Sequence, residues 1–99
     1  MQEALGIIET KGFATAVEAA DAALKAANVR VAEYQKAGGG RVDIILRGDV
    51  AAVKAAVEAA VASASQIGKV EGQTVIPRPA DKISPVFNLE PMKEDKKVK

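Results

Sequence analysis

The order of the hydrophobic periodicities constrains the fold of this chain more than any other feature. Four short segments rich in β-branched residues are typical of strands, at residues 4–9, 29–35, 41–47 and 69–76. Two longer segments carry apolar residues at helical spacing, at residues 13–28 and 50–67. The sequence therefore predicts an α+β sandwich of ferredoxin-like βαββαβ topology. Right-handed crossovers place both helices on one face of its antiparallel sheet.

The ends of the helices are predicted from capping preferences. We expect residues 10–12 to form a turn before the first helix and Asn28 to end that helix in a left-handed conformation. Asp49 is a good N-cap for the second helix, and Gly68 ends it. The apolar face of the first helix is predicted to consist of Phe13, Ala16, Val17, Ala20, Leu24 and Ala27.

Many of the apolar residues of this chain are small. Alanine accounts for 20 residues, and the aromatic residues are two Phe and one Tyr. A monomer of 99 residues would therefore pack thinly, because small domains bury a smaller share of their surface. We expect the chain to complete its burial against copies of itself. The helical alanines allow two interpretations: close packing of a helix on its own sheet, or contact of outward alanines with a neighbouring subunit.

The charge and the missing residue types exclude several function classes. A net charge of +1 offers no electrostatic footprint for nucleic acid or an anionic membrane. Without His or Cys the chain lacks the usual general base, the commonest metal ligand and a thiolate nucleophile. Many classes of enzyme are therefore excluded, and we expect no cofactor and no metal site. From the first residues we expect no signal peptide, and the longest run of large apolar residues is 44–46, so a cytoplasmic protein is expected.

The last quarter of the chain differs in composition from the rest. It holds all four prolines, which keep regular structure short. A short C-terminal helical turn is expected at residues 84–87. Because the final residues are mostly charged, we expect one domain over residues 1–90 and a frayed tail over residues 91–99. A basic docking tag is the alternative interpretation of this tail.

Three features of the sequence have an ordinary structural interpretation. The glycine-rich segment 36–40 lies between two predicted strands and is typical of a hairpin loop. It does not fit a phosphate-binding loop, because a strand rather than a helix follows it. Lys25 can pair with Asp21 at i,i+4 spacing on the first helix. Arg78 lies between two prolines and can be an exposed loop residue.

Five segments of the chain together carry a resemblance to a known family. They are EALGIIETKG at residues 3–12, EAADA at residues 18–22, KAANV at residues 25–29, RGDVAAVKAA at residues 47–56 and VIPRP at residues 75–79. In this order and spacing they resemble the hexameric BMC-domain shell proteins of bacterial microcompartments. The match runs from about Glu3 to Phe87 and needs no gap.

The resemblance implies a structural shell protein in the bacterial cytoplasm rather than an enzyme. Members of this family form cyclic hexamers that tile with other shell hexamers, trimers and pentamers into facets around encapsulated enzymes. The resemblance also implies a central pore for small polar metabolites. The residues that would line this pore are Lys36, Ala37, Gly38, Gly39 and Gly40. Glycine would leave the main chain to define the rim, and Lys36 would favour anionic or polar metabolites.

By the same resemblance, Lys25, Asn28 and Arg78 lie at the edge where hexamers meet. Two Lys25 side chains from adjacent hexamers would lie antiparallel, with their methylene stems buried and their amines on carbonyl oxygens. Asn28 would supply amide hydrogen bonds, and Arg78 would insert at the neighbouring edge. Encapsulated enzymes, or their targeting peptides, are further expected partners.

Other classes of protein share the predicted topology. A ferredoxin-like regulatory ligand-binding oligomer is the main alternative, and an enzyme of the acylphosphatase type is another. Both would need a phosphate-binding arrangement, which the sequence does not show. An RNA-binding module of this topology would need stacking aromatic residues on its central strands, and these are missing as well.

Overall fold

Six elements follow one another along residues 3–80, the part of the chain that the computed structural model describes. The strands are β1 (Ala4–Lys11), β2 (Val29–Ala37), β3 (Arg41–Gly48) and β4 (Val70–Ile76), and the helices are α1 (Phe13–Ala26) and α2 (Val50–Ala64). The predicted element order is confirmed. The helical turn predicted at residues 84–87 and the tail predicted at residues 91–99 lie outside the described residues.

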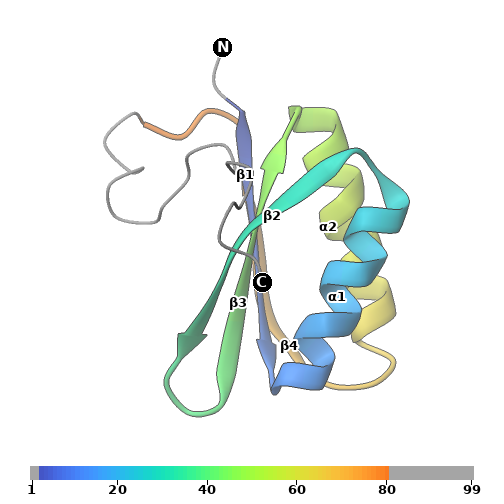
Figure 1. The fold of residues 1–99 in the computed structure, drawn as a ribbon, viewed down its shortest axis with the longest axis vertical. Coiled ribbons are helices and arrows are strands. Elements are labelled where there is room, and N and C mark those ends of the chain that lie inside the picture. Colours follow the sequence, from blue (N-terminus) through green and yellow to red (C-terminus); the bar gives the residue numbers. More distant parts are fainter. Residues whose placement is uncertain (1–2, 81–99) are drawn as a thin grey trace, which may run out of the picture.

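The four strands form one sheet in the order β2-β3-β1-β4, and all neighbouring strands are antiparallel. Strand β1 lies inside the sheet and pairs with β3 on one side and β4 on the other. Both helices cover the same face of the sheet, as Figure 1 shows. This arrangement confirms the predicted α+β sandwich of ferredoxin-like topology.

The main core lies between the sheet and the two helices. Strand residues such as Ile8, Ile44 and Leu46 pack there, because alternate residues of a strand point to the same face. The opposite face of the sheet, called here the far face, carries a smaller cluster around Leu5 and Ile45. By the same alternation and by their cross-strand pairing, Glu9, Lys11, Arg41 and Asp43 also lie on the far face.

Small residues form the contact between the two helices and the sheet. Six helical alanines of this core are fully buried: Ala16, Ala19, Ala23, Ala56, Ala60 and Ala64. Their short side chains let the backbones approach closely. Other alanines of α2, among them Ala51 and Ala55, are exposed. Close packing therefore accounts for the alanines on the inner faces of the helices but not for those on the outer face of α2.

The apolar face predicted for α1 is partly wrong. The buried residues of this helix are Thr15, Ala16, Ala19, Ala20 and Ala23. Three of the predicted core residues, Phe13, Val17 and Leu24, are instead 65%, 44% and 50% exposed. The physical reason is that α1 lies close to α2 and to the sheet, so that only small side chains fit on its inner face. The large side chains therefore point outward.

Several predicted boundaries also differ from the structure. Helix α1 ends at Ala26, and its C-cap Ala27 is extended with φ −156° and ψ 166°, so the helix ends before Asn28 is reached. Residues 10 and 11 belong to β1 rather than to a turn, because they pair with β3. Asp49 is the N-cap of α2, as predicted, although its side chain makes no capping hydrogen bond.

Candidate functional site

The triglycine turn, Gly38, Gly39 and Gly40, connects β2 and β3 at one end of the sheet. Gly39 and Gly40 have φ values of 72° and 80°, a left-handed conformation that strains any residue with a side chain. The carbonyl of Gly38 accepts a hydrogen bond from the Arg41 N–H at 3.4 Å, and the carbonyl of Gly40 accepts one from the Gly12 N–H at 2.8 Å. The tip of the hairpin is therefore a tight turn of bare main chain.

Lys36 and Ala37 lie in β2 and not in the turn. Lys36 is opposite Val42 in β3, and Ala37 is opposite Arg41. The loop predicted at residues 36–40 is thus shorter than expected, because regular strand pairing continues until the glycines require the left-handed conformation. The structure nevertheless places all five predicted pore residues together at the end of this hairpin.

Two cationic side chains that the sequence analysis did not assign to the site lie against the turn. A Cβ atom on Gly39 would lie 3.4 Å from Nη1 of Arg41, and one on Gly40 would lie 3.6 Å from Cε of Lys11. Arg41 could have been assigned to the site from the sequence, because it directly follows the glycines. Lys11 is distant in sequence, and only the pairing of β1 with β3 brings it to this place.

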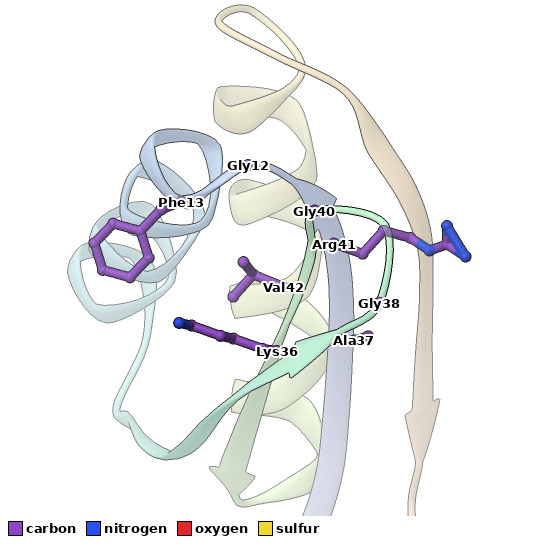
Figure 2. A pocket seen from close by; sticks show the side chains of 8 residues that line it. All are labelled: Gly12, Phe13, Lys36, Ala37, Gly38, Gly40, Arg41 and Val42. Carbon is purple, nitrogen blue, oxygen red and sulfur yellow. The ribbon is translucent and has the colours of Figure 1, made fainter.

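A hollow of about 640 Å³ lies beside the turn. Its lining includes Phe13 of α1, Lys36 of β2 and Val42 of β3. In Figure 2, Lys36 extends on the side of Phe13, whereas Arg41 extends on the other side of the hairpin. The ring of Phe13 also contacts that of Tyr34, with centroids 6.4 Å apart. On the side of the helices, the surroundings of the turn are therefore mainly apolar, with the amine of Lys36 as the charged group. The guanidinium of Arg41 lies on the far-face side.

An acidic pair lies next to the cations on the far face. Glu9 and Asp43 are cross-strand partners, and Oε2 of Glu9 lies 3.8 Å from Nε of Arg41. Burial, together with the neighbouring Glu9, raises the pKa of Asp43 to about 6, although Arg41 opposes the shift. Oδ1 of Asp43 is buried without a hydrogen-bond partner among the described residues. This sheet position therefore carries less negative charge near pH 6 than two free carboxylates would.

The predicted edge residues occupy two separate places in the fold. Lys25 lies in the last turn of α1, where Nζ is 2.9 Å from Oδ2 of Asp21, and this contact raises the pKa of the amine. The predicted i,i+4 pair is thus confirmed. Asn28 lies in the connection from α1 to β2, and Arg78 is exposed after the end of β4. Within residues 3–80, no hydrogen bond or ion pair joins the three predicted edge residues.

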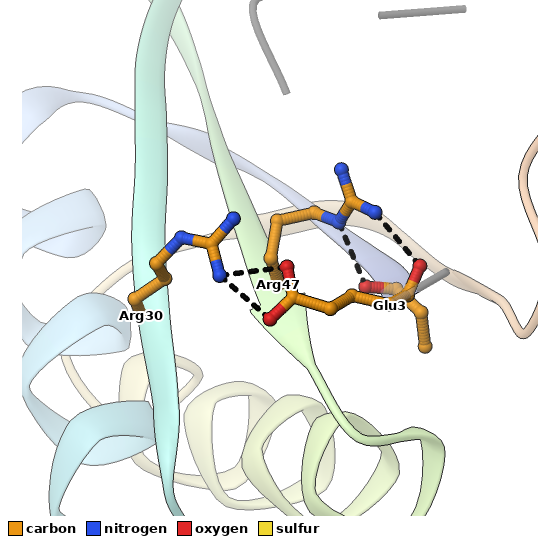
Figure 3. A network of polar contacts seen from close by, with 4 residues as sticks. Glu3, Arg30 and Arg47 are labelled. Carbon is orange, nitrogen blue, oxygen red and sulfur yellow. Dashed lines mark hydrogen bonds and ion pairs between the residues drawn. The ribbon is translucent and has the colours of Figure 1, made fainter. Parts of the chain in front are cut away.

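Glu3 links two arginines at the start of β1, as Figure 3 shows. Arg47 is only 6% exposed, and it donates from Nε to the Ala4 carbonyl at 3.0 Å and from Nη2 to the Glu3 carbonyl at 2.8 Å. Nη1 of Arg30 lies 2.7 Å from Oε1 of the Glu3 carboxylate. These contacts hold the beginning of β1 against β2 and β3.

Among the described residues, no cluster of His, Cys, Asp and Glu could hold a metal ion. No helix in the same part of the chain has both the length and the apolar character needed to cross a membrane.

Comparison with known proteins decides the family. The family model of the BMC domain matches residues 4–79. The chain belongs to the BMC-domain family. The resemblance noted in five sequence segments is therefore confirmed.

Curated relatives of this BMC-domain chain are shell proteins. The bacterial microcompartment shell protein PduA of Citrobacter freundii is 56% identical over 78 residues, which are 79% of this chain and 84% of the relative. EutM of Escherichia coli, another microcompartment shell protein, is 47% identical over 88% of this chain and 90% of the relative. The carboxysome shell protein CcmK2 of Thermosynechococcus vestitus is 48% identical over 90% of this chain and 89% of the relative. These relatives place the chain among structural shell components, not enzymes.

A solved structure supports the fold. The microcompartment protein of Desulfitobacterium hafniense superposes with a TM-score of 0.78 at 29% identity. The match covers 95% of this chain and 52% of the other, so this chain spans about half of that protein. The BMC-domain chain therefore shares its architecture with a microcompartment protein.

Proposed function

We propose that this chain is a structural shell subunit that closes into a hexameric ring and tiles with other rings into the facets of a bacterial microcompartment. The observation that carries the proposal is an apolar stripe on the outside of the folded domain. Phe13, Val17 and Leu24 of α1 and Tyr34 of β2 form this stripe, and each of their side chains is at least 44% exposed. Exposed apolar patches on folded domains mark interaction surfaces.

The stripe is continuous across two elements. Val17 and Leu24 follow Phe13 by 4 and 11 residues, spacings that return to the same side of a helix. The contact between the rings of Phe13 and Tyr34 extends the stripe to β2, which is the edge strand of the sheet. The stripe thus lies at a lateral border of the subunit, where a neighbour in a planar assembly would pack.

The occupant of the stripe is a second copy of this chain. The inner faces of the helices are built from alanine, so the large side chains contribute little to the core of the single subunit. Burial against another copy removes their apolar surface from water. A stripe that meets a different surface of the next copy gives head-to-tail contacts, which close into a ring. The hexameric count comes from the resemblance to the family.

In this ring the triglycine turn surrounds the axis. Gly39 and Gly40 place no side chain in the opening, so main-chain groups define the rim of a pore for small polar metabolites. Lys36 and Ala37, at the end of β2, flank this rim together with Gly38. The bare, tight turn of the hairpin supports the assignment.

Lys25, Asn28 and Arg78 make the contact between rings. Lys25, Asn28 and Arg78 are all exposed. Edge contacts would connect this ring to other shell hexamers, trimers and pentamers. One shell domain over residues 1–90, with a tail at residues 91–99, fits this assembly. The enclosed enzymes, or their targeting peptides, are the partners on one side of the facet.

Mass measurement of the purified chain tests the ring. We expect native mass spectrometry to show a hexamer and negative-stain electron microscopy to show flat arrays. The substitution Val17→Glu should abolish the ring, because it places a charge in an interface that excludes water. Circular dichroism should show an unchanged fold, since Val17 is exposed in the subunit.

The matched control is Val17→Ile, which keeps the side chain apolar and should keep the ring. A wild-type chain that remains monomeric at high concentration would refute the ring. If Val17→Glu still forms hexamers, the stripe is not the subunit interface, and the assignment of the contact surface is wrong.

A further inference from the structure

We propose that the end of this chain, residues 81–99, docks on the far face of its own sheet and is held there by contacts between lysines and carboxylates. The apolar residues of this segment lie on the cluster of Leu5 and Ile45, and its last lysines lie at Glu33 and Asp43. The contact is made within a single chain, so it does not rest on the proposed ring.

The centre of the far face is buried, although no helix or strand of residues 3–80 covers it. Leu5 and Ile45 are each 1% exposed, and they lie on the side of the sheet opposite α1 and α2. Side chains of a strand stand roughly perpendicular to the sheet. Neighbours in the same sheet, Ile7, Ala32 and Ile76, therefore flank these two side chains but do not cover their ends. A second layer is needed on this face.

The chain turns toward the far face directly after β4. This strand ends at Ile76, the cross-strand partner of Leu5. The next residues run on the side of the sheet away from the helices, as the orange segment of Figure 1 shows. Pro79 is buried there, although it belongs to no helix or strand. The described chain thus ends beside the cluster, and the segment that follows is the nearest occupant.

The segment carries the apolar residues that such a layer needs. They follow within ten residues of Pro79 and are Ile83, Val86, Phe87 and Leu89. The first three have the spacing i, i+3 and i+4, which places them on one side of a helical turn. Packing of an aromatic ring and aliphatic side chains on the cluster removes apolar surface of both partners from water.

Two carboxylates beside the cluster lack hydrogen-bond donors. Glu33 is the cross-strand partner of Ile45 and lies on the same face. Its Oε2 accepts a hydrogen bond from Nε2 of Gln35 at 3.1 Å. Its Oε1 is buried without a partner among the described residues, as is Oδ1 of Asp43. Because buried polar atoms in folded proteins are normally hydrogen-bonded, these two oxygens point to donors that lie beyond residue 80.

The end of the segment supplies such donors. Four of its last seven residues are lysines, namely Lys93, Lys96, Lys97 and Lys99. An ammonium group offers three N–H donors and a positive charge. Lys96 follows Ala80 by 16 residues. An extended chain of this length reaches about 50 Å, whereas Asp43 lies only about 7 Å from Ile45 along β3. The charged end thus becomes a docking tag for the same chain.

Two nearby cations decide which carboxylates the lysines meet. Nε of Arg41 lies 3.8 Å from Oε2 of Glu9, and Lys11 is opposite Arg41 beside the turn. Glu9 is therefore partly balanced by a cation of the described chain. Because like charges repel, the lysines of the segment are directed away from the turn, toward Asp43 and Glu33.

A nitroxide on the segment tests the docking in the full chain. The chain has no Cys, so Asn88→Cys gives a single labelling site. The methyl groups of Ile45 and Ile76 lie on the far face, and those of Ile8 and Ile44 belong to the core on the other face. We expect the nitroxide to broaden the methyl NMR signals of the first pair at least about threefold more, because packed layers lie about 10 Å apart.

Mixed samples identify the occupant. Nitroxide-labelled chains without isotopes are unfolded and refolded together with isotope-labelled chains without nitroxide. Docking within one chain predicts strong broadening of Ile45 only when both labels are on the same chain. Equal broadening in the mixed sample would overturn the proposal in favour of the segment of another copy. Absence of broadening in both samples would overturn it as well, because a different layer would then cover the far face.

Charge variants test the lysine contacts. Replacement of the three lysines at positions 96, 97 and 99 by Gln should lower the broadening of Ile45 by about half, and 1 M salt should do the same in the wild type, because the screening length falls to about 3 Å. Glu33→Gln and Asp43→Asn should act in the same direction. Lys54→Gln, on the exposed side of α2, is the matched control and should have no effect. Unchanged broadening in the triple variant would refute the contacts at Glu33 and Asp43.

Discussion

Gly6 of β1 lies directly against Val53 of α2. A Cβ atom on Gly6 would lie 2.8 Å from Cγ1 of Val53, a distance that real Cβ contacts do not reach, and 2.9 Å from Cγ2 of Val57. Helix α2 therefore rests on the main chain of the central strand β1. This contact sets the separation between helix and sheet, and it explains why so many buried residues of the layer are alanine.

The close contact at Gly6 predicts that one added methyl group at this position destabilises the fold. We expect Gly6→Ala to reduce the free energy of unfolding by about 1–3 kcal/mol, the usual range for overpacking a core. Urea unfolding measures the change. Gly72→Ala is the matched control, because Gly72 is also a strand glycine but a Cβ there meets no atom within 4 Å. Equal stability of the two variants would show that α2 can move away from β1 freely.

Asp43 predicts a dependence of stability on pH. Its pKa of about 6 in the folded chain lies above its ordinary value of 3.8. The folded state therefore binds the proton more tightly than the unfolded state. This contribution to stability is present below about pH 4 and is lost as the pH rises through about 6. At pH 7 the ionised carboxylate beside Glu9 destabilises the fold.

The variant Asp43→Asn should remove this dependence. We expect it to be more stable than the wild type at pH 7, by about 1 kcal/mol after allowance for the partial exposure of the site. The difference should shrink as the pH falls toward 4. Urea unfolding of both proteins over this range gives the comparison. Parallel stability curves would show that Asp43 titrates alike in the folded and unfolded states.

Substitution of Arg47 should destabilise the fold strongly, although this residue lies outside the helix–sheet core. Replacement by Met should lower the free energy of unfolding by about 2–4 kcal/mol, because the carbonyls of Glu3 and Ala4 lose a charged donor. Thermal unfolding would show the loss. Arg30→Gln is the comparison, and its effect should be smaller because the Arg30 side chain is 27% exposed. A larger effect of Arg30→Gln would mean that the ion pair, rather than the buried arginine, holds β1.

If Lys25 and Arg78 form the contact between rings, variants of these residues should still assemble into rings but not into sheets. Lys25→Ala and Arg78→Ala should keep the mass of the ring and weaken the formation of flat arrays. Lys54→Ala, which removes an exposed lysine of α2, should leave arrays intact. Negative-stain micrographs and native mass spectrometry provide the two readouts. Arrays of normal order in Lys25→Ala would remove this residue from the edge.

The sequence predicted the elements but misplaced some of their faces. Short runs of β-branched residues identified the strands, but only the fold shows that Ile8, Ile44 and Leu46 point toward the helices. Helical spacing identified α1, but the size of a hydrophobic side chain did not show which side of the helix is buried. Phe13 and Val17 fit a core stripe by spacing alone. Only the close approach of α1 to its neighbours shows that Ala16 and its companions occupy the inner face.

Only part of the candidate site was predicted, because some of its features are local to the sequence and others depend on the fold. The run of three glycines identifies a tight turn, because a left-handed main chain is a local property of the residue type. Lys36 was assigned to the site because the family resemblance implies a pore at this turn and Lys36 flanks the glycines. The approach of Lys11 could not be predicted, because it follows from the register between β1 and β3, residues about 30 positions apart in the chain.

Local properties of the sequence by themselves determined the order of elements, the bare turn and the family to which the chain belongs. The tertiary structure alone decided three things: which apolar side chains remain outside, which cations meet at the turn, and that Glu9 and Asp43 lie side by side. The physical reason is that helix and strand periodicity act over neighbouring residues. Packing distance and strand register depend on atoms that only the complete fold brings together.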